Sequence, residues 1–221
     1  MNGAESLINA LAEHGVDACF ANPGTSEMQL VAALDKQPQI RAVLCLFEGV
    51  VTGAADGYGR MADKPALTLL HLGPGFANGI ANLHNAQRAH SPILNMVGDH
   101  ATDHLQHDAP LTSDIRGMAT PVSQSFSVSP NAEGLAQTGL QALSDSQSYP
   151  GSISTFVVPA DHAWTAIAPP ITHLPGITTA RASDETIAAV AEQLRGAQHS
   201  ALFLGGRALR AEALYQAGRI A

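Results

Sequence analysis

The stretch Ile40–Met61, with the sequence IRAVLCLFEGVVTGAADGYGRM, joins an apolar run of branched residues to a run of small residues. Ile40–Leu46 has the composition of a buried strand, and Glu48–Met61 predicts a helix that contains four glycines. Glycine inside a helix lowers its stability, so we expect another backbone or a ligand to pack closely against this helix. Glu48 stands at the junction, where a single carboxylate would lie at the mouth of an apolar cleft.

Helix and strand patterns alternate on both sides of this stretch. Further strands are predicted at Asp17–Phe20, Ala66–Leu70, Pro92–Val97, Val122–Val128 and Ile153–Val158. Further helices are predicted at Gly3–His14, Glu27–Asp35 (capped by Thr25 or Ser26), Phe76–Arg88 and Ala132–Asp145, with a polar loop at Gly98–Ser113. The alternation predicts an α/β fold, a three-layer α/β/α domain with a six-stranded, mainly parallel sheet.

Parallel sheets of this kind bind ligands at the carboxyl ends of their strands. Three groups of residues fall at predicted strand ends: the turn Asn22–Thr25, the acid Glu48, and the segment Gly73–Asn78. We therefore expect these groups to border one cleft.

The regular pattern lapses over Pro159–Ala182, which holds four prolines and is typical of a linker. We expect a first domain over 1–163, a linker over 164–182, and the start of a second α/β domain over 183–221. That last part predicts a helix at Asp184–Arg195, a strand at Ala201–Leu204 and a helix beginning near Ala208. One strand and two helices cannot bury a core, so we interpret the tail as truncated.

Composition excludes several classes of partner. The chain has 221 residues, a net charge of −8 and no block of Lys or Arg, which disfavours nucleic acid and anionic membranes. It has no apolar run of 18 residues and no basic signal-peptide start, and Cys19 and Cys45 both lie in apolar runs typical of buried thiols. These features indicate a cytoplasmic protein. Only 14% of residues are charged, so some apolar surface is expected to face a partner.

Each candidate site residue has a structural and a functional interpretation. Glu48 is either an acid at a helix N-terminus, favoured by the helix dipole, or a proton partner held in an apolar pocket. His71 is either a core histidine or a proton shuttle at a strand end, and Thr25 is most simply a helix cap. Gly73-Pro74-Gly75 is either a tight βα turn or a cradle for a polar group, and its spacing does not match a dinucleotide fingerprint.

The His- and Asp-rich segment 99–108 lies in the predicted polar loop. His100 and His104 have helical spacing, but the surroundings indicate a loop and no HExxH motif is present. We therefore expect a solvated loop here and no metal ligands in this chain. Hydrolysis by a serine nucleophile is also disfavoured, since the sequence has no G-x-S-x-G motif.

Taken together, these segments resemble the thiamine-diphosphate-dependent enzymes of the acetolactate synthase and benzoylformate decarboxylase group, in their N-terminal pyrimidine-binding domain. The resemblance covers about Gly3–Ala163, and the order and spacing of its motifs are specific. The residues that carry it are Phe20–Glu27 (FANPGTSE), Glu48 with Ala55–Arg60 (ADGYGR), Gly73-Pro74-Gly75 with Asn78, and Ser91-Pro92.

The resemblance implies a role for each candidate residue. Glu48 would hydrogen-bond N1′ of the cofactor's aminopyrimidine and so activate thiamine diphosphate for attack on a 2-oxo acid. His71 would transfer protons to intermediates, and Thr25 would lie near the reacting carbon. The residues implied to bind the cofactor are Asn22, Pro23, Gly24, Glu48, Gly73 and Asn78.

The resemblance also implies that the complete enzyme is a 2-oxo acid decarboxylase or carboligase, a lyase or transferase. Its diphosphate and Mg²⁺ would bind to a separate domain absent from these 221 residues. A second copy of the subunit, in a dimer or tetramer, would complete the active site. Without these parts, the chain is expected to be inactive alone and to bind cofactor weakly or not at all.

Two other hypotheses remain open from the sequence. The chain could be a stand-alone pyrimidine-domain subunit that pairs with a separate diphosphate-domain chain, although the unfinished tail disfavours this. It could also be a non-catalytic α/β module that binds a nucleotide.

Overall fold

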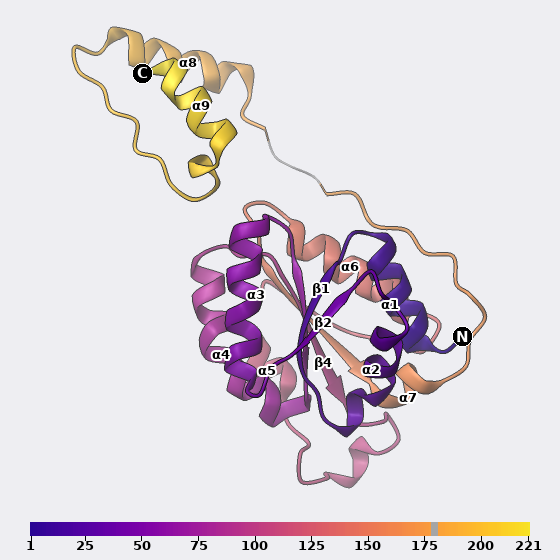
Figure 1. Ribbon diagram of the computed structural model, residues 1–221. Coiled ribbons are helices and arrows are strands. Elements are labelled where there is room, and N and C mark those ends of the chain that lie inside the picture. The colour runs from indigo at the N-terminus through magenta and orange to yellow at the C-terminus, as the bar shows by residue number, and fades with distance from the viewer. Residues whose placement is uncertain (178–180) are drawn as a thin grey trace. The chain divides into compact units, whose positions relative to one another are not determined.

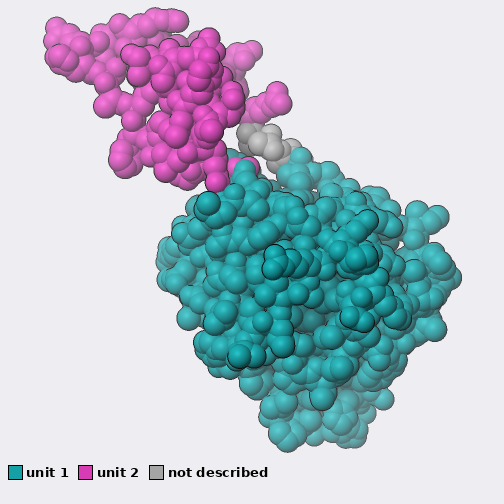
Figure 2. Space-filling view, in the orientation of Figure 1, with its two compact units in different colours: residues 1–177 teal, residues 178–221 magenta. Residues whose placement is uncertain are grey.

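The computed structural model describes residues 1–177 and 181–221, which form two compact units, Met1–Ile177 and Thr178–Ala221 (Figure 2). The first and larger unit contains the sheet and all the candidate site residues.

Six strands of the first unit form one sheet, in the order β2-β1-β3-β4-β6-β5. Every pair of neighbouring strands is parallel, which confirms the predicted sheet. The strands are β1 (Ala18–Asn22), β2 (Arg41–Leu44), β3 (Ala66–Leu70), β4 (Ile93–Asp99), β5 (Ser125–Val128) and β6 (Ile153–Pro159).

Helices cover both faces of the sheet (Figure 1). One layer contains α1 (Gly3–Glu13), α2 (Met28–Asp35), α6 (Leu135–Gln147) and α7 (Ala160–Trp164). The other contains α3 (Glu48–Ala62), α4 (Leu72–Arg88) and α5 (Ile115–Ala119). Side chains alternate across a strand, so β3 supplies Leu67 and Leu69 to one apolar core and Leu70 to the other. The three predicted layers are thus confirmed.

A chain of buried polar side chains crosses the middle of the sheet. Asn95 of β4 is fully buried; its Oδ1 accepts from the Thr68 hydroxyl at 2.7 Å, and its Nδ2 donates to Thr155 Oγ1 at 3.0 Å. Buried polar groups cost free energy unless they are paired, and here three strands satisfy one another. Cys19 and Cys45 are buried and free, as predicted, and burial raises the pKa of the Cys19 thiol to about 12.

Several local features of the first unit differ from the predictions. Gly73-Pro74-Gly75 is not a turn but part of the first turn of α4, which begins at Leu72; proline is tolerated there because first-turn N–H groups have no intrahelical acceptor. Neither Thr25 nor Ser26 caps α2, because both lie in the 3₁₀ helix η1 (Thr25–Glu27). Two short helices, α5 and α7, were not predicted.

The second unit contains α8 (Asp184–Gly196), the 3₁₀ helix η3 (Gly206–Leu209) and α9 (Ala211–Ile220). Both predicted helices are therefore present. The predicted strand at Ala201–Leu204 is wrong, since these described residues have no strand structure. A strand needs a neighbour for its backbone hydrogen bonds, and the described part of this unit offers none. Neither helix has a buried residue.

Across the described residues, no helix combines the length and apolarity required to cross a lipid bilayer.

Candidate functional site

The carboxyl ends of β1, β2 and β3 place three candidate segments close together. β1 and β3 are neighbours, and Asn22 pairs with Leu70 at the ends of the two strands. The chain then continues from β1 into α2 on one face and from β3 into α4 on the other. Because neighbouring connections leave to opposite faces, a crevice opens between these strand ends, the usual ligand position in such sheets.

Glu48 is the first residue of α3 and is partly exposed. Its Oε2 accepts a hydrogen bond of 3.2 Å from Nδ2 of Asn78 on α4. Its Oε1 accepts none from the residues that the structure describes. A Cβ added to Gly75 would lie 3.3 Å from that Oε1. The carboxylate is therefore held on one side by an amide, and its other oxygen faces space that a glycine keeps open.

Close packing of α3 on α4 brings Glu48 and Asn78 together. The Thr52 hydroxyl lies 2.9 Å from the Gly79 carbonyl oxygen and 3.1 Å from that of Glu48. A Cβ on Gly79 would approach Thr52 Cγ2 to 2.9 Å. One glycine of α3 also allows a close approach of another segment. A Cβ on Gly59 would lie 2.9 Å from the Pro92 carbonyl oxygen. The expected close approach of another backbone is confirmed at Gly59.

His71 directly follows β3, and its ring lies against the turn that follows β1. A Cβ on Gly24 would lie 2.4 Å from Nδ1 of the His71 ring. That Nδ1 is 2.8 Å from Oε2 of Glu27, and the same oxygen accepts the Gly24 N–H at 2.7 Å. Gly75 links this group to Glu48, since a Cβ there would also lie 3.0 Å from Cβ of His71.

The other predicted residues lie around this centre. Asn22 and Pro23 are partly buried at the end of β1. Gly73 packs instead against the loop before α5, where its Cβ would overlap Ser113 Oγ at 2.0 Å. Thr25 is exposed and borders a separate surface pocket of about 410 Å³ with His100 and other residues. The structure thus brings Glu48, Asn78, His71 and Gly24 together, and none of the contacts given above joins Gly73 or Thr25 to this group.

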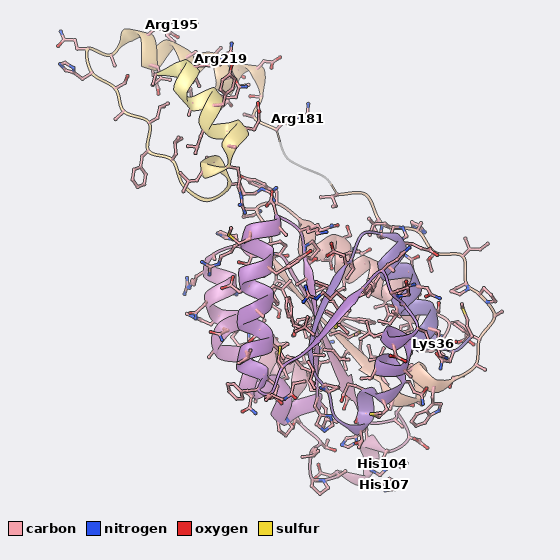
Figure 3. The ribbon with its side chains drawn as sticks, viewed as in Figure 1. Lys36, His104, His107, Arg181, Arg195 and Arg219 are labelled. Carbon is pink, nitrogen blue, oxygen red and sulfur yellow. The ribbon has the colours of Figure 1, made fainter. Side chains whose placement is uncertain are left out.

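The histidines of the loop after β4 pack on one another. The ring centroids of His100 and His104 are 5.3 Å apart, and those of His104 and His107 are 5.5 Å apart. Figure 3 labels His104 and His107 in this loop. Burial raises the pKa of the preceding Asp99. Within the described residues, no group of three or more His, Cys, Asp or Glu side chains is arranged to hold a metal ion.

Glu27 was not predicted as a site residue, yet it touches two that were. Its side chain is fully buried, whereas an acid at the start of a helix is usually solvated. The sequence did contain a signal for this contact, because Glu27 comes three residues after Gly24. At that spacing the side chain of an acid can fold back and accept the free backbone N–H at the start of a helix.

Comparison with known proteins identifies the family of this chain. Residues 1–120 match the family model described as thiamine pyrophosphate enzyme, N-terminal TPP binding domain. The provisionally named acetolactate synthase large subunit IlvX of Mycobacterium tuberculosis is 49% identical over all 221 residues, which span 42% of its length. Benzoylformate decarboxylase of Pseudomonas aeruginosa is 34% identical over 103 residues, which cover 47% of this chain and 19% of that protein.

Solved structures agree with the sequence relatives. The thiamine diphosphate-dependent 4-hydroxybenzoylformate decarboxylase of Rhodococcus jostii RHA1 superposes with a TM-score of 0.80 at 26% identity, over 90% of this chain and 38% of that one. Its sheet and helices therefore correspond to those described above. The family match covers more than half of the residues, and the chain belongs to the thiamine pyrophosphate enzymes, of which it carries the N-terminal TPP-binding domain.

Proposed function

We propose that this chain provides the pyrimidine-binding half of the active site of a thiamine-diphosphate-dependent 2-oxo acid decarboxylase or carboligase. The observation that carries the proposal is the Glu48 carboxylate, which Asn78 holds through one oxygen while the other stays open beside Gly75. The family match supports the cofactor. The names of the relatives, acetolactate synthase and benzoylformate decarboxylase, support 2-oxo acids as the substrate class.

The donor and acceptor set fits an aminopyrimidine ring. A carboxylate oxygen accepts a hydrogen bond from a protonated ring nitrogen, and Oε1 of Glu48 is open for that purpose. Any side chain at position 75 would crowd that oxygen, since a Cβ would already lie 3.3 Å away. The bound cofactor would supply a nucleophilic carbon and a sink for the electrons released by decarboxylation.

The remaining roles fall to residues around Glu48. Asn78 orients the Glu48 carboxylate, and His71 exchanges protons with the reacting group. Asn22, Pro23, Gly24 and Gly73 are proposed to line the cofactor cleft, and Thr25 to contact the substrate. The proposed domain limits are 1–163 for the binding domain, 164–182 for the linker and 183–221 for the start of a central domain.

The other half of the site is proposed to come from outside these residues. The chain spans 42% of the length of IlvX, and we infer that the diphosphate and its Mg²⁺ bind to a further domain, in a second copy of the subunit. Leu46, Phe47 and Val50 flank Glu48 with exposed fractions of 91%, 50% and 55%. Exposed apolar side chains beside a candidate site favour a covering partner. The free, buried cysteines fit a reducing cytoplasm.

The test is Glu48→Gln in the full-length protein with thiamine diphosphate and Mg²⁺. Glutamine keeps the shape of the side chain but not the negative charge that stabilises a proton on the ring nitrogen. We expect proton exchange at the cofactor's thiazolium C2, followed by NMR after acid quenching, to slow by orders of magnitude. Glu13→Gln, on an exposed position of α1, is the matched control. Exchange within a few-fold of wild type, with the far-UV circular dichroism unchanged, would falsify the role of Glu48.

A second test concerns His71. Because a proton donor matters differently for different intermediates, His71→Ala should change kcat by factors that differ among pyruvate, benzoylformate and larger 2-oxo acids. General acid–base groups contribute about 10²–10⁴-fold. Unaltered kinetics with every substrate would remove His71 from the site.

A further inference from the structure

We propose that Glu27 is a positioning residue that acts through His71, by keeping a proton on Nδ1 so that only Nε2 exchanges protons with the reacting group. The inference rests on the proposed function for its catalytic consequence. Its structural part, the protonation of one named ring nitrogen, can be measured without any cofactor.

The contacts of the Glu27 carboxylate determine which His71 nitrogen carries hydrogen. Oε2 of Glu27 lies 2.8 Å from Nδ1 of His71 and accepts the Gly24 N–H at 2.7 Å. Oε2 already accepts the Gly24 N–H, and an ionised carboxylate only accepts hydrogen bonds. With Glu27 ionised, Nδ1 is therefore the donor. In the neutral ring this leaves the lone pair on Nε2, and in the protonated ring the second proton is on Nε2. In both states the nitrogen that gains or loses a proton is Nε2.

The buried position of the Glu27 side chain is unfavourable for the stability of the fold. Its side chain is fully buried, whereas that of His71 is 20% exposed. Its Oε1 is buried and has no hydrogen-bond partner among the described residues. Leaving a buried polar atom unpaired costs folding free energy. Such a cost is expected where a group serves a neighbouring functional side chain.

A glycine on the neighbouring strand makes room for this side chain. A Cβ added to Gly98 of β4 would lie 1.7 Å from Oε1 of Glu27. The second glycine, Gly24, packs against the ring of His71, the partner of Glu27. Gly98 thus packs on the carboxylate and Gly24 on the imidazole, and these two contacts limit how far the paired side chains can turn.

The experiment measures the two ring nitrogens of His71 by ¹⁵N NMR in the 221-residue chain labelled at histidine, with the His71 signals assigned by their loss in His71→Ala. Wild type should show a protonated-type shift at Nδ1 and an unprotonated-type shift at Nε2 at neutral to basic pH. In Glu27→Ala the protonated-type signal should move to Nε2, the preference of an imidazole without a partner. Glu27→Gln, which can still accept at the Oε2 position, should keep the wild-type pattern.

Glu5→Gln is the matched control. Glu5 also reaches back to a backbone N–H three residues earlier, that of Asn2, and it pairs with Lys36 at 2.7 Å on the α1–α2 side (Figure 3). The Glu5→Gln variant should leave the His71 signals unchanged. An Nε2-protonated ring in wild type would overturn the proposal whether or not any variant folds, and so would an unchanged pattern in folded Glu27→Ala.

Kinetics in the full-length protein separate a positioning role from a purely structural one. Glu27→Ala should lower kcat about 10²-fold, the scale of a misplaced catalytic group, and should have no further effect in the His71→Ala background. Independent, multiplicative effects would refute action through His71. If Glu48→Gln proves harmless while the tautomer changes as expected, the proposed function fails and the assignment of Glu27 to Nδ1 stands.

Discussion

Gly98→Ala should be among the most destabilising single-methyl changes in the first unit. Gly98 lies within β4 and has no positive φ, so backbone strain does not contribute. The added Cβ would lie 1.7 Å from Oε1, 2.5 Å from Cδ and 2.7 Å from Cγ of Glu27. The whole carboxyl group must move, because every one of these separations is shorter than a van der Waals contact.

The expected size of the effect follows from the contacts that this movement breaks. Gly24 and His71 would both lose their acceptor, and hydrogen bonds to a charged group contribute about 1.5–3 kcal/mol each. Replacing glycine restricts the unfolded chain and returns about 0.4–1 kcal/mol. We therefore expect the free energy of unfolding to fall by about 2–5 kcal/mol, a large part of the ~5–15 kcal/mol typical of a domain.

Urea unfolding, followed by far-UV circular dichroism, measures this difference from the change in midpoint at constant m-value. Gly57→Ala is the matched control, since a Cβ there meets nothing within 4 Å on α3, and it should stabilise the chain by about 0.5–1 kcal/mol. The cost of Gly98→Ala should largely disappear in a Glu27→Ala background, where the colliding atoms are gone. A loss below about 0.5 kcal/mol, or a cost that survives removal of Glu27, would show that the carboxyl group lies elsewhere.

Two further predictions concern the interior of the sheet. Asn95→Ala should lower the free energy of unfolding by about 2–5 kcal/mol, because it leaves the buried Thr68 hydroxyl without its partner, takes from Thr155 one of two partners (the other is Ser123) and opens a cavity in the sheet; a change under about 1 kcal/mol in the same urea assay would contradict the buried network. Cys19 and Cys45 should not react with Ellman's reagent at pH 8 in the native chain and should both react in denaturant, because burial raises both thiol pKa values, that of Cys19 to about 12; rapid native labelling would refute their burial.

The sheet and the main helices could be predicted because their periodic patterns are long. The fully buried strand β3 has the predicted limits Ala66–Leu70, and its apolar run is continuous, as expected for a strand covered on both faces. The single-turn helices α5 and α7 were missed because five residues carry too little periodicity to distinguish them from loops. The start of α4 was missed because Gly73, Pro74 and Gly75 have low helix propensity, which packing against the loop and the cleft overrides.

The site was predictable one residue at a time but not as an arrangement. Glu48 stands out at the end of an apolar run, yet its contact with Asn78 spans 30 positions of the chain and depends on how closely α3 approaches α4. That approach is set by Thr52 and Gly79, whose pairing has no local signature in the sequence. Tertiary packing, rather than spacing, therefore fixes the orientation of the carboxylate.

Glu27 illustrates what strand register adds to such a prediction. With β1 ending at Phe20, as the sequence indicated, Glu27 is an ordinary acid at the start of a helix. In the structure β1 continues to Asn22, level with Leu70 at the end of β3. The residues that follow each strand, Gly24 on one side and His71 on the other, are then forced into contact at the switch between the two helical layers. An acid three residues beyond Gly24 that folds back onto its N–H must also meet the His71 ring, so two extra residues of strand pairing convert a helix-terminal acid into a partner of the candidate proton donor.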